Sequence, residues 1–374
     1  MMLLASVALA LLAPGGGARS TTAPALERLR LIDAWLTGRS AGPPAHWRVR
    51  SPRDLTDDHE ILVESKQKEV NASWLAPATA NATLVPVVVK ALHKAGPFAF
   101  GHRESDIAYF ELLYLEFLRG EAGIPVLYGG WTTPSHVVWV TWNGGRPVAQ
   151  GRGTRRVPAM FPAQYNQLAR DAPLALAKAW FKCFRSFGER GGFVLTDFKP
   201  EQFTFDDRGH IYLVDGPAPN SGPIADFARR HFTSGHPDGI YVPGGDYYRP
   251  ENPDLEPGKP WSCEDNTAAM CGRRTYKYHH CPVGKSGGYC QDQDDGGPLS
   301  APELTECRNG TCAAFDWRVH VYDVAAKSWL LPRIIRMAAD RDAAKKLKAL
   351  AATMTAADPR DRPTFDALLR RLAA

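Results

Sequence analysis

The chain has 374 residues, of which 44% are hydrophobic and 23% are charged. This composition is typical of a soluble globular protein, and the length allows two domains or two lobes. The formal net charge of +5 is mild and spread along the chain, and no basic stripe with interleaved aromatic residues is present. We therefore expect no nucleic-acid partner.

The N-terminus carries an apolar run, LLASVALALLA, at residues 3–13. The run is too short to span a bilayer comfortably and matches the hydrophobic region of a signal peptide. Small residues follow, so we expect residues 1–18 to be cleaved and the protein to be secreted or to reside in the ER or Golgi lumen, without a stable membrane span. The run lacks a preceding basic residue, which leaves a short signal anchor or a buried helix as alternatives. Residues 19–55 form a polar, proline-rich extension with one expected helix, ALERLRLIDAWL.

Residues 59–92 are predicted to be strands, the clearest being LVPVVVKAL, whose continuous apolar character suits a strand covered on both faces. Lys90 stands near its end, where it either reaches solvent at the sheet edge or is placed for function. The next stretch, SDIAYFELLYLEFLRG, predicts an amphipathic helix that ends near Gly120. At about 100° per residue, Glu111 falls within the apolar stripe of this helix and Glu116 falls on the far side. A carboxylate on an apolar face needs a partner, so Glu111 is expected to have a buried partner; the alternative is a solvated or helix-capping Glu111.

The stretch FVLTDFKPEQFTFDDRGHIYLVDG, at 193–216, carries the densest set of candidate functional residues. It predicts a short strand, a loop with Asp197, Lys199 and Gln202, and a hairpin whose second strand ends at Asp215. Two carboxylates would then lie at the ends of neighbouring strands with a lysine between them. This arrangement suits phosphoryl transfer, in which one carboxylate orients a hydroxyl, the other holds Mg²⁺ and the lysine steadies the phosphate. The alternative is an ordinary hairpin with acidic turn residues.

The order of these residues resembles the catalytic segment of protein kinases. DFKPEQ is similar to the DLKPEN form of Ser/Thr kinases, and Asp215 falls where kinases carry the metal-binding Asp of Asp-Phe-Gly. With the expected signal peptide, the chain looks most like the divergent secretory-pathway kinases, which include the divergent protein kinase domain family and the vertebrate lonesome kinase group. The resemblance implies an α+β, two-lobed protein kinase-like fold, with a small β-rich N-lobe over 56–145 and a larger helical C-lobe over 146–374.

The resemblance also implies an activity. Asp197 would act as the catalytic base, and Lys199 would contact the γ-phosphate of ATP. Kinases pair a strand lysine with a glutamate of the following helix, so Glu111 rather than Glu116 would pair with Lys90, and the two would hold the other phosphates. The acceptor would be a Ser/Thr or sugar hydroxyl of a secretory or extracellular protein. The resemblance makes no statement about the oligomeric state.

The remaining implied positions concern the metal and the fold. Asp215 and Gln202 would bind Mg²⁺ or Mn²⁺, with Gln202 in the place of the kinase Asn and its amide oxygen one methylene further out. Ala-Pro-Glu, ending at Glu303, matches the motif that closes the kinase activation segment. Asp323 would tie a C-lobe helix to the catalytic loop, and Arg362 would pair with Glu303.

Six of the seven cysteines crowd into a Cys-rich insertion at about 258–312: Cys263, Cys271, Cys281, Cys290, Cys307 and Cys312. An even, clustered set after a signal peptide predicts three disulfides, with the pairing left open. A zinc site that includes His279 and His280 is the alternative. Cys183 stands alone in a helical pattern and is expected to be a packed core thiol. Three sequons predict N-glycosylation at Asn71, Asn81 and Asn309.

Departures from the kinase pattern leave the function open. No glycine occurs in ESKQKEVNASWLA, where a Gly-rich loop would precede Lys90, and Leu195-Thr196 replaces the His-Arg pair before Asp197. The two main hypotheses are an active secretory kinase and a secreted pseudokinase that acts as a binding, scaffold or activator protein through its Cys-rich segment. A small-molecule kinase of the same fold and an unrelated lumenal protein are further alternatives.

Overall fold

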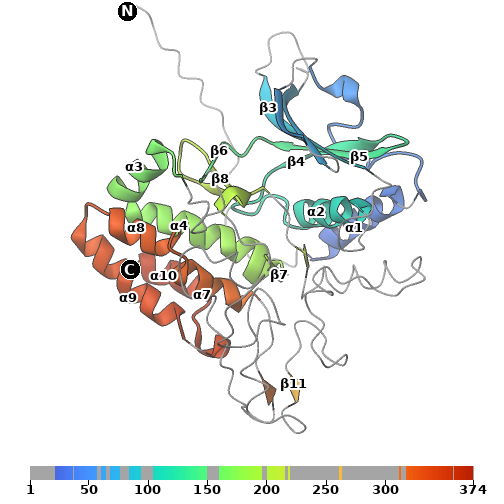
Figure 1. Ribbon diagram of the computed structural model, residues 1–374. Coiled ribbons are helices and arrows are strands. Elements are labelled where there is room, and N and C mark those ends of the chain that lie inside the picture. Colours follow the sequence, from blue (N-terminus) through green and yellow to red (C-terminus); the bar gives the residue numbers. More distant parts are fainter. Residues whose placement is uncertain are drawn as a thin grey trace, which may run out of the picture.

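The computed structural model in Figure 1 describes the following residues: 22–36, 38–56, 60–64, 68–75, 84–93, 104–149, 160–195, 200–214, 218–219, 261–262, 311–312, 317–356 and 358–373. Within them, the mixed α+β class is confirmed, with a sheet-rich N-terminal part and a mostly helical C-terminal part. None of the helices that can be described has the length and apolar character needed to cross a membrane.

The N-terminal part is built on a five-stranded antiparallel sheet with the order β1-β2-β3-β5-β4. Its strands are β1 (Glu60–Glu64), β2 (Lys68–Leu75), β3 (Val85–His93), β4 (Leu127–Thr132) and β5 (His136–Trp142). The β-branched and aromatic residues of VPVVVKALH and HVVWVTW suit a pleated, half-buried surface. Strand β3 is central and pairs with β2 on one side and β5 on the other.

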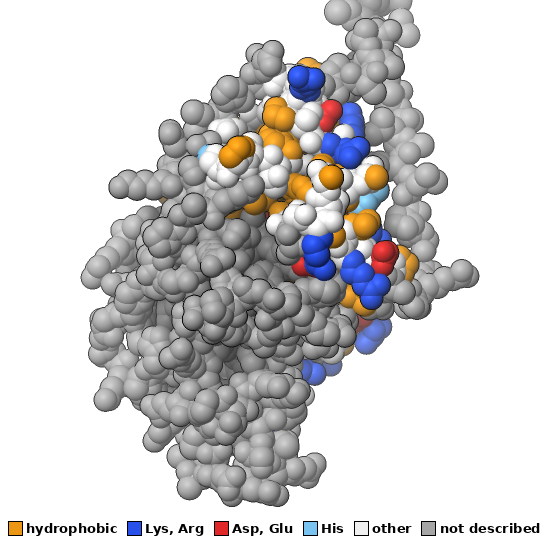
Figure 2. Space-filling model, turned by 90° about the vertical axis from the view of Figure 1, so that its right-hand side faces the viewer, with side chains coloured by type: hydrophobic (Ala, Val, Ile, Leu, Met, Phe, Trp, Pro, Cys, Tyr) orange, Lys and Arg blue, Asp and Glu red, His pale blue; other side chains and the backbone are white. Residues whose placement is uncertain are grey.

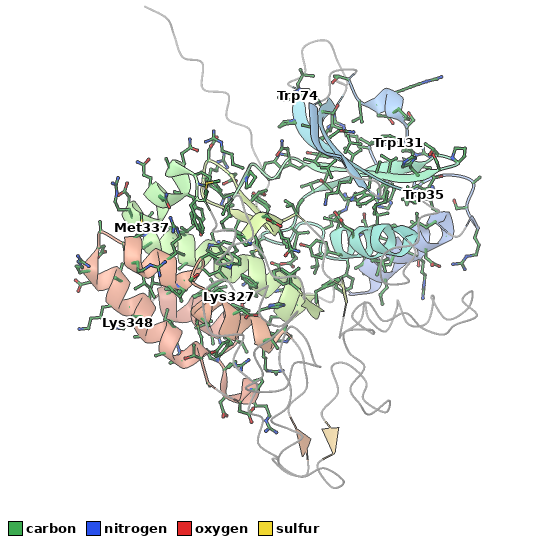
Figure 3. All side chains as sticks on the ribbon, in the orientation of Figure 1. Trp35, Trp74, Trp131, Lys327, Met337 and Lys348 are labelled. Carbon is green, nitrogen blue, oxygen red and sulfur yellow. The ribbon has the colours of Figure 1, made fainter. Side chains whose placement is uncertain are left out.

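Two helices lie under this sheet (Figure 1). Helix α2 (Glu104–Phe117) packs against the sheet, and helix α1 (Thr22–Leu36) packs against α2. The leucine spacing of α1 buries Leu29 and Ile32 completely. Trp35, labelled in Figure 3, lies between the helices and the sheet, and its ring contacts Trp47 edge-on with 5.2 Å between the centroids.

The segment after α1 runs along the sheet. Its backbone pairs with β4 in a parallel bridge between Val49 and Gly129, and with β2 in an antiparallel bridge between Leu55 and Leu75. Gly129 has φ +142°, and a Cβ there would lie 2.1 Å from the carbonyl oxygen of Val49, so only glycine permits this approach. The outer edge of the sheet is therefore covered by residues that precede the sheet in the sequence. Figure 2 shows the face on this side of the molecule, where Lys and Arg side chains are scattered among apolar ones.

The C-terminal part is mostly helical, with the helices α3 (Ala163–Asp171), α4 (Pro173–Phe184), α7 (Arg318–Ala326), α8 (Leu331–Met337), α9 (Arg341–Met354) and α10 (Phe365–Ala373). Pro173 is the first residue of α4, where its missing N–H and fixed φ suit a helix start. A π-helical turn, η2 (Arg185–Arg190), continues α4 and leads to the short strand β7 (Phe193–Val194). Phe184 lies at the centre of this part, with ring contacts to Trp180, Phe187, Phe203, His320 and Phe365.

Short strands complete the structure. Strands β6 (Arg146–Pro147), β8 (Phe203–Phe205) and β9 (Ile211–Leu213) form a small sheet, and the 3₁₀ turn η3 (Pro200–Gln202) leads directly into β8. The strand pairs β7 with β10 (Ala218–Pro219) and β11 (Trp261–Ser262) with β12 (Thr311–Cys312) are antiparallel. Two further 3₁₀ turns, η1 (Pro52–Asp54) and η5 (Pro359–Asp361), precede β1 and α10.

Candidate functional site

The predicted contact between Lys90 and Glu111 is present and buried. Lys90 Nζ on β3 lies 2.5 Å from Glu111 Oε1 on α2, and the two side chains are 6% and 3% exposed. Lys90 occurs near the end of β3, on the face that packs against α2, so the long side chain extends along the interface between sheet and helix. The alternative in which Glu111 is solvated is excluded by this burial.

A tryptophan of the neighbouring strand completes the surroundings of Glu111. Lys90 pairs directly with Trp139 between β3 and β5, and paired residues of antiparallel strands present their side chains on the same face. Trp139 is fully buried and donates its indole N–H to Glu111 Oε1 at 3.2 Å. One carboxylate oxygen therefore receives a charged donor and a neutral donor from adjacent strands.

The same lysine reaches the C-terminal part of the chain. Lys90 Nζ donates a hydrogen bond to the carbonyl oxygen of Val214, the residue directly after β9. The N–H of Val214 in turn donates to the carbonyl oxygen of Gln202 at 2.9 Å, and the Gln202 side chain is buried. The structure thus connects Lys90, Glu111, Gln202 and the residue before Asp215.

The hairpin that carries Val214 is held from both sides. Its turn is closed by Asp206, whose carboxylate accepts the N–H groups of Arg208 and His210 at 2.9 Å each. On strand β9, the N–H of Leu213 donates to the carbonyl oxygen of Gly123 at 3.0 Å. The hydroxyl of Tyr114 on α2 donates to the carbonyl oxygen of Leu213 at 3.4 Å. These contacts join the end of β9 to α2 and to the loop that follows it, so the segment that carries the acceptor of the Lys90 ammonium is held in place at two points.

Three of the predicted site residues, Asp197, Lys199 and Asp215, lie outside the described residues. The described chain stops at Leu195 and resumes at Pro200, and stops again at Val214. Described residues therefore stand in the sequence on both sides of each of these three positions.

Asp323 is buried on α7, and its neighbour His320 was not found by sequence reasoning. His320 Nδ1 lies 3.7 Å from Asp323 Oδ2, and His320 Nε2 accepts the N–H of Leu195 at 2.9 Å. An acceptor at Nε2 requires the neutral tautomer with the proton on Nδ1. The available signal was the spacing: a histidine one turn before Asp323 in the apolar stretch VHVYDV. Within the described residues, His320 thus lies between Asp323 and the backbone of Leu195.

Arg362 is buried near the start of α7. Its guanidinium donates to the carbonyl oxygens of Ala356 at 2.8 Å and Arg318 at 3.1 Å, and lies 5.1 Å from the centre of the Tyr322 ring. Its predicted partner Glu303 lies outside the described residues.

The cysteine and glycosylation predictions fall mostly outside the described residues. This applies to Asn81 and Asn309 and to all cysteines of the insertion except Cys312, whose backbone lies in β12. Asn71 lies half-buried in β2, which pairs with β1 and β3. Cys183 is a buried free thiol, as predicted, and burial raises its pKa, so it is a neutral packing group and not a nucleophile.

The donor types of the site fit a hard cation. Gln202 offers an amide oxygen and Asp215 a carboxylate, and Mg²⁺ and Mn²⁺ prefer oxygen ligands of these kinds. No group of three or more His, Cys, Asp or Glu side chains suited to a metal occurs within the residues that the structure describes.

Comparison of the sequence with known protein families finds no family model that matches, and comparison with curated proteins also gives no match.

Proposed function

We propose that this chain is a secretory-pathway, protein kinase-like phosphotransferase that moves the γ-phosphate of ATP to a Ser/Thr or sugar hydroxyl. One observation carries the proposal: the Lys90–Glu111 pair is buried and is bonded to Val214, the residue before Asp215. Three stretches that are far apart in the sequence meet at this lysine: strand β3, helix α2 and the end of the β8–β9 hairpin.

The burial of this pair supports a functional purpose. Two charges taken out of water lose hydration that their mutual attraction restores only with good geometry, and apolar residues of similar volume often give equal or greater stability. Here the charges lie between a sheet and a helix, next to the fully buried side chain of Trp139. A buried ion pair that is also bonded to the residue before Asp215 is therefore a candidate functional site.

In the proposed reaction, Lys90 binds the non-transferred phosphates and Glu111 holds the ammonium in position. Asp197 orients the acceptor hydroxyl and takes its proton as the oxygen attacks the γ-phosphorus, while the bond to the leaving ADP oxygen breaks. Lys199 contacts the γ-phosphate as its charge is redistributed. Asp215 and Gln202 would hold Mg²⁺ or Mn²⁺, which when bound neutralises phosphate charge.

Nucleotide binding by the full-length secreted chain tests the proposal. Thermal unfolding would be followed with ATP and Mg²⁺ or Mn²⁺, for the wild type, Lys90→Met and Asp215→Ala, each compared with its own midpoint without nucleotide. Lys348→Met is the matched control, because Lys348 is an exposed lysine on α9 far from β3 (Figure 3). A ligand at one hundred times its Kd stabilises by about 2.7 kcal/mol, so a metal-dependent shift that only the first two variants lose is expected.

Transfer is then measured with γ-labelled ATP and secreted acceptor proteins, with Asp197→Asn as the inactive variant. No thermal shift at millimolar ATP would overturn the proposal. The second candidate is a secreted pseudokinase with a binding or activator function, favoured by the absence of glycine from the β1–β2 stretch that would cover the phosphates. Its signature would be normal folding with neither nucleotide binding nor transfer.

A further inference from the structure

Helix α2 carries a second buried carboxylate that the proposed reaction does not use. Glu116 is fully buried, five residues after Glu111. At about 100° per residue the two side chains leave the helix about 140° apart, so they face different partners. Glu111 faces the sheet, whereas Glu116 faces α1 and the segment that follows it.

The groups around Glu116 come mainly from residues 22–56. Arg28 on α1 lies 2.7 Å from Oε1, and its guanidinium also donates to the Glu116 carbonyl oxygen at 3.3 Å. The Trp47 indole donates to Oε2 at 3.2 Å, and His46 Nε2 lies 3.3 Å from Oε1. Arg119, one turn along from Glu116, donates to both oxygens at 3.0 Å and 2.8 Å. Among the residues that the structure describes, the N-terminal segment thus contributes three of the four side chains that contact this carboxylate.

Glu116 is charged in this environment. Burial alone would raise its pKa, but the hydrogen bond and charge of Arg119, the hydrogen bond from Trp47 and the charge of His46 outweigh burial and lower the pKa. Removing donors from a buried carboxylate leaves a charge with unmet hydrogen-bonding capacity, which is strongly unfavourable. The position of α2 and the position of the N-terminal segment therefore depend on each other.

The same segment also holds the sheet. Beyond Trp47, Val49 accepts the N–H of Gly130 on β4 at 2.9 Å, and Thr56 donates to the carbonyl oxygen of Trp74 on β2 at 3.0 Å. Residues 22–56 therefore bind both the helix that carries Glu111 and the sheet that carries Lys90. Any relative movement of helix and sheet would disturb these contacts.

We propose that residues 22–56 are a built-in positioning element for the Lys90–Glu111 pair, and that they act on α2 through Glu116. The inference uses the proposed function only for its nucleotide readout. Weakening the contact at Glu116 loosens α2, separates Glu111 from Lys90 and lowers nucleotide affinity while the C-terminal part keeps its fold.

Arg28→Met tests the inference, with Arg30→Met as its matched control. Both are arginines on α1, but Arg30 contacts the exposed Glu27 on the same helix instead of Glu116. The first readout requires no activity: the rate at which Lys90 is acylated by an amine-reactive ester in the full-length chain, measured by mass spectrometry. Lys90 is only 5% exposed, so its acylation reports local opening. We expect about a tenfold faster rate in Arg28→Met, since loss of the positive charge beside the buried Glu116 carboxylate and of the hydrogen bond to the Glu116 carbonyl oxygen is worth about that factor, and no change in Arg30→Met.

The second readout is ATP affinity, which we expect to fall by a similar factor in Arg28→Met only. If the wild type binds no nucleotide, the proposed function fails, but the acylation rates still decide this inference. Glu116→Gln is the second variant, in case Arg28→Met fails to fold, and the same acceleration is expected of it. Equal Lys90 acylation rates in the wild type and in a folded Arg28→Met or Glu116→Gln protein would overturn the inference.

Discussion

A double-mutant cycle on Lys90 and Glu111 measures whether these charges are as deeply buried as the structure indicates. Lys90→Met keeps the length of the side chain and removes the charge, whereas Glu111→Gln keeps the shape and removes the other charge. After Lys90→Met, the Glu111 carboxylate keeps the indole N–H of Trp139 but loses its counter-ion. After Glu111→Gln, the ammonium keeps the carbonyl oxygen of Val214.

The expected magnitudes follow from the burial of the pair. Both side chains are at most 6% exposed, so removal of one partner leaves a charge that water cannot solvate. Breaking a buried pair in this way costs about 3–5 kcal/mol of the free energy of unfolding. The two single variants should lose similar amounts, because in each the remaining charge keeps one neutral hydrogen-bond partner. The double variant contains no buried charge at this position, so we expect a coupling energy of about 2–3 kcal/mol.

Urea unfolding, followed by tryptophan fluorescence and by far-UV circular dichroism, measures each free energy where the two signals coincide. The control is the same cycle on Arg30 and Glu27, whose side chains are 66% and 61% exposed at a separation of 3.0 Å. We expect this exposed pair to couple by less than about 0.5 kcal/mol. If the Lys90 cycle gives a value as small as the control, the pair is not desolvated and the argument for a buried functional lysine fails.

Three further predictions concern packing and pH. Gly123→Ala should destabilise the protein by about 1–3 kcal/mol more than Gly120→Ala, as measured by urea unfolding. Both glycines have nearly the same φ (+83° and +84°), but only a Cβ at 123 would lie 2.7 Å from Cys183. Equal effects of the two substitutions would contradict this contact. Because the pKa of Glu116 is lowered, its charge stabilises the fold above the ordinary value of 4.5, and the stability advantage of the wild type over Glu116→Gln should shrink as the pH falls below 4.5. The pKa of Glu189 is raised by burial and a neighbouring carboxylate, so Glu189→Gln should gain stability relative to the wild type as the pH rises above 4.5. For either glutamate, a stability difference between wild type and variant that stays constant across pH in urea unfolding would refute the pKa shift.

The partner of Lys90 could be predicted from two signals in the sequence. The apolar stripe of the helix indicated that Glu111 needs a buried partner, and the resemblance to kinases, which pair a strand lysine with a glutamate of the following helix, indicated Lys90 as that partner. The start of α4 at Pro173 and the turn of the β8–β9 hairpin at Asp206–Gly209 coincide with local sequence signals of the same kind. These parts of the fold are encoded within a few residues of where they occur.

The environment of Glu116 could not be predicted in this way. Helical periodicity correctly placed it on the far side from Glu111, but a polar residue on the far side of an amphipathic helix is ordinarily solvated. Its partners Arg28 and Trp47 are 88 and 69 residues away in the sequence. His320 escaped notice for a related reason, since its acceptor contact with Leu195 spans 125 residues. Contacts of this range depend on how elements dock, which no local pattern specifies.

The two carboxylates of α2 together restrict the helix more tightly than either does alone. Apolar packing tolerates small rotations, because one methyl group can replace another at an interface. Rotation of α2 by one residue, about 100°, would instead move Glu111 away from Lys90 and turn Glu116 away from Arg28, leaving two buried charges without partners. Buried polar groups of this kind can select one rotational position of a helix among several positions that bury a similar apolar area. A helix that must present Glu111 to Lys90 at a fixed distance benefits from that selection, and Glu116 supplies it from the opposite side.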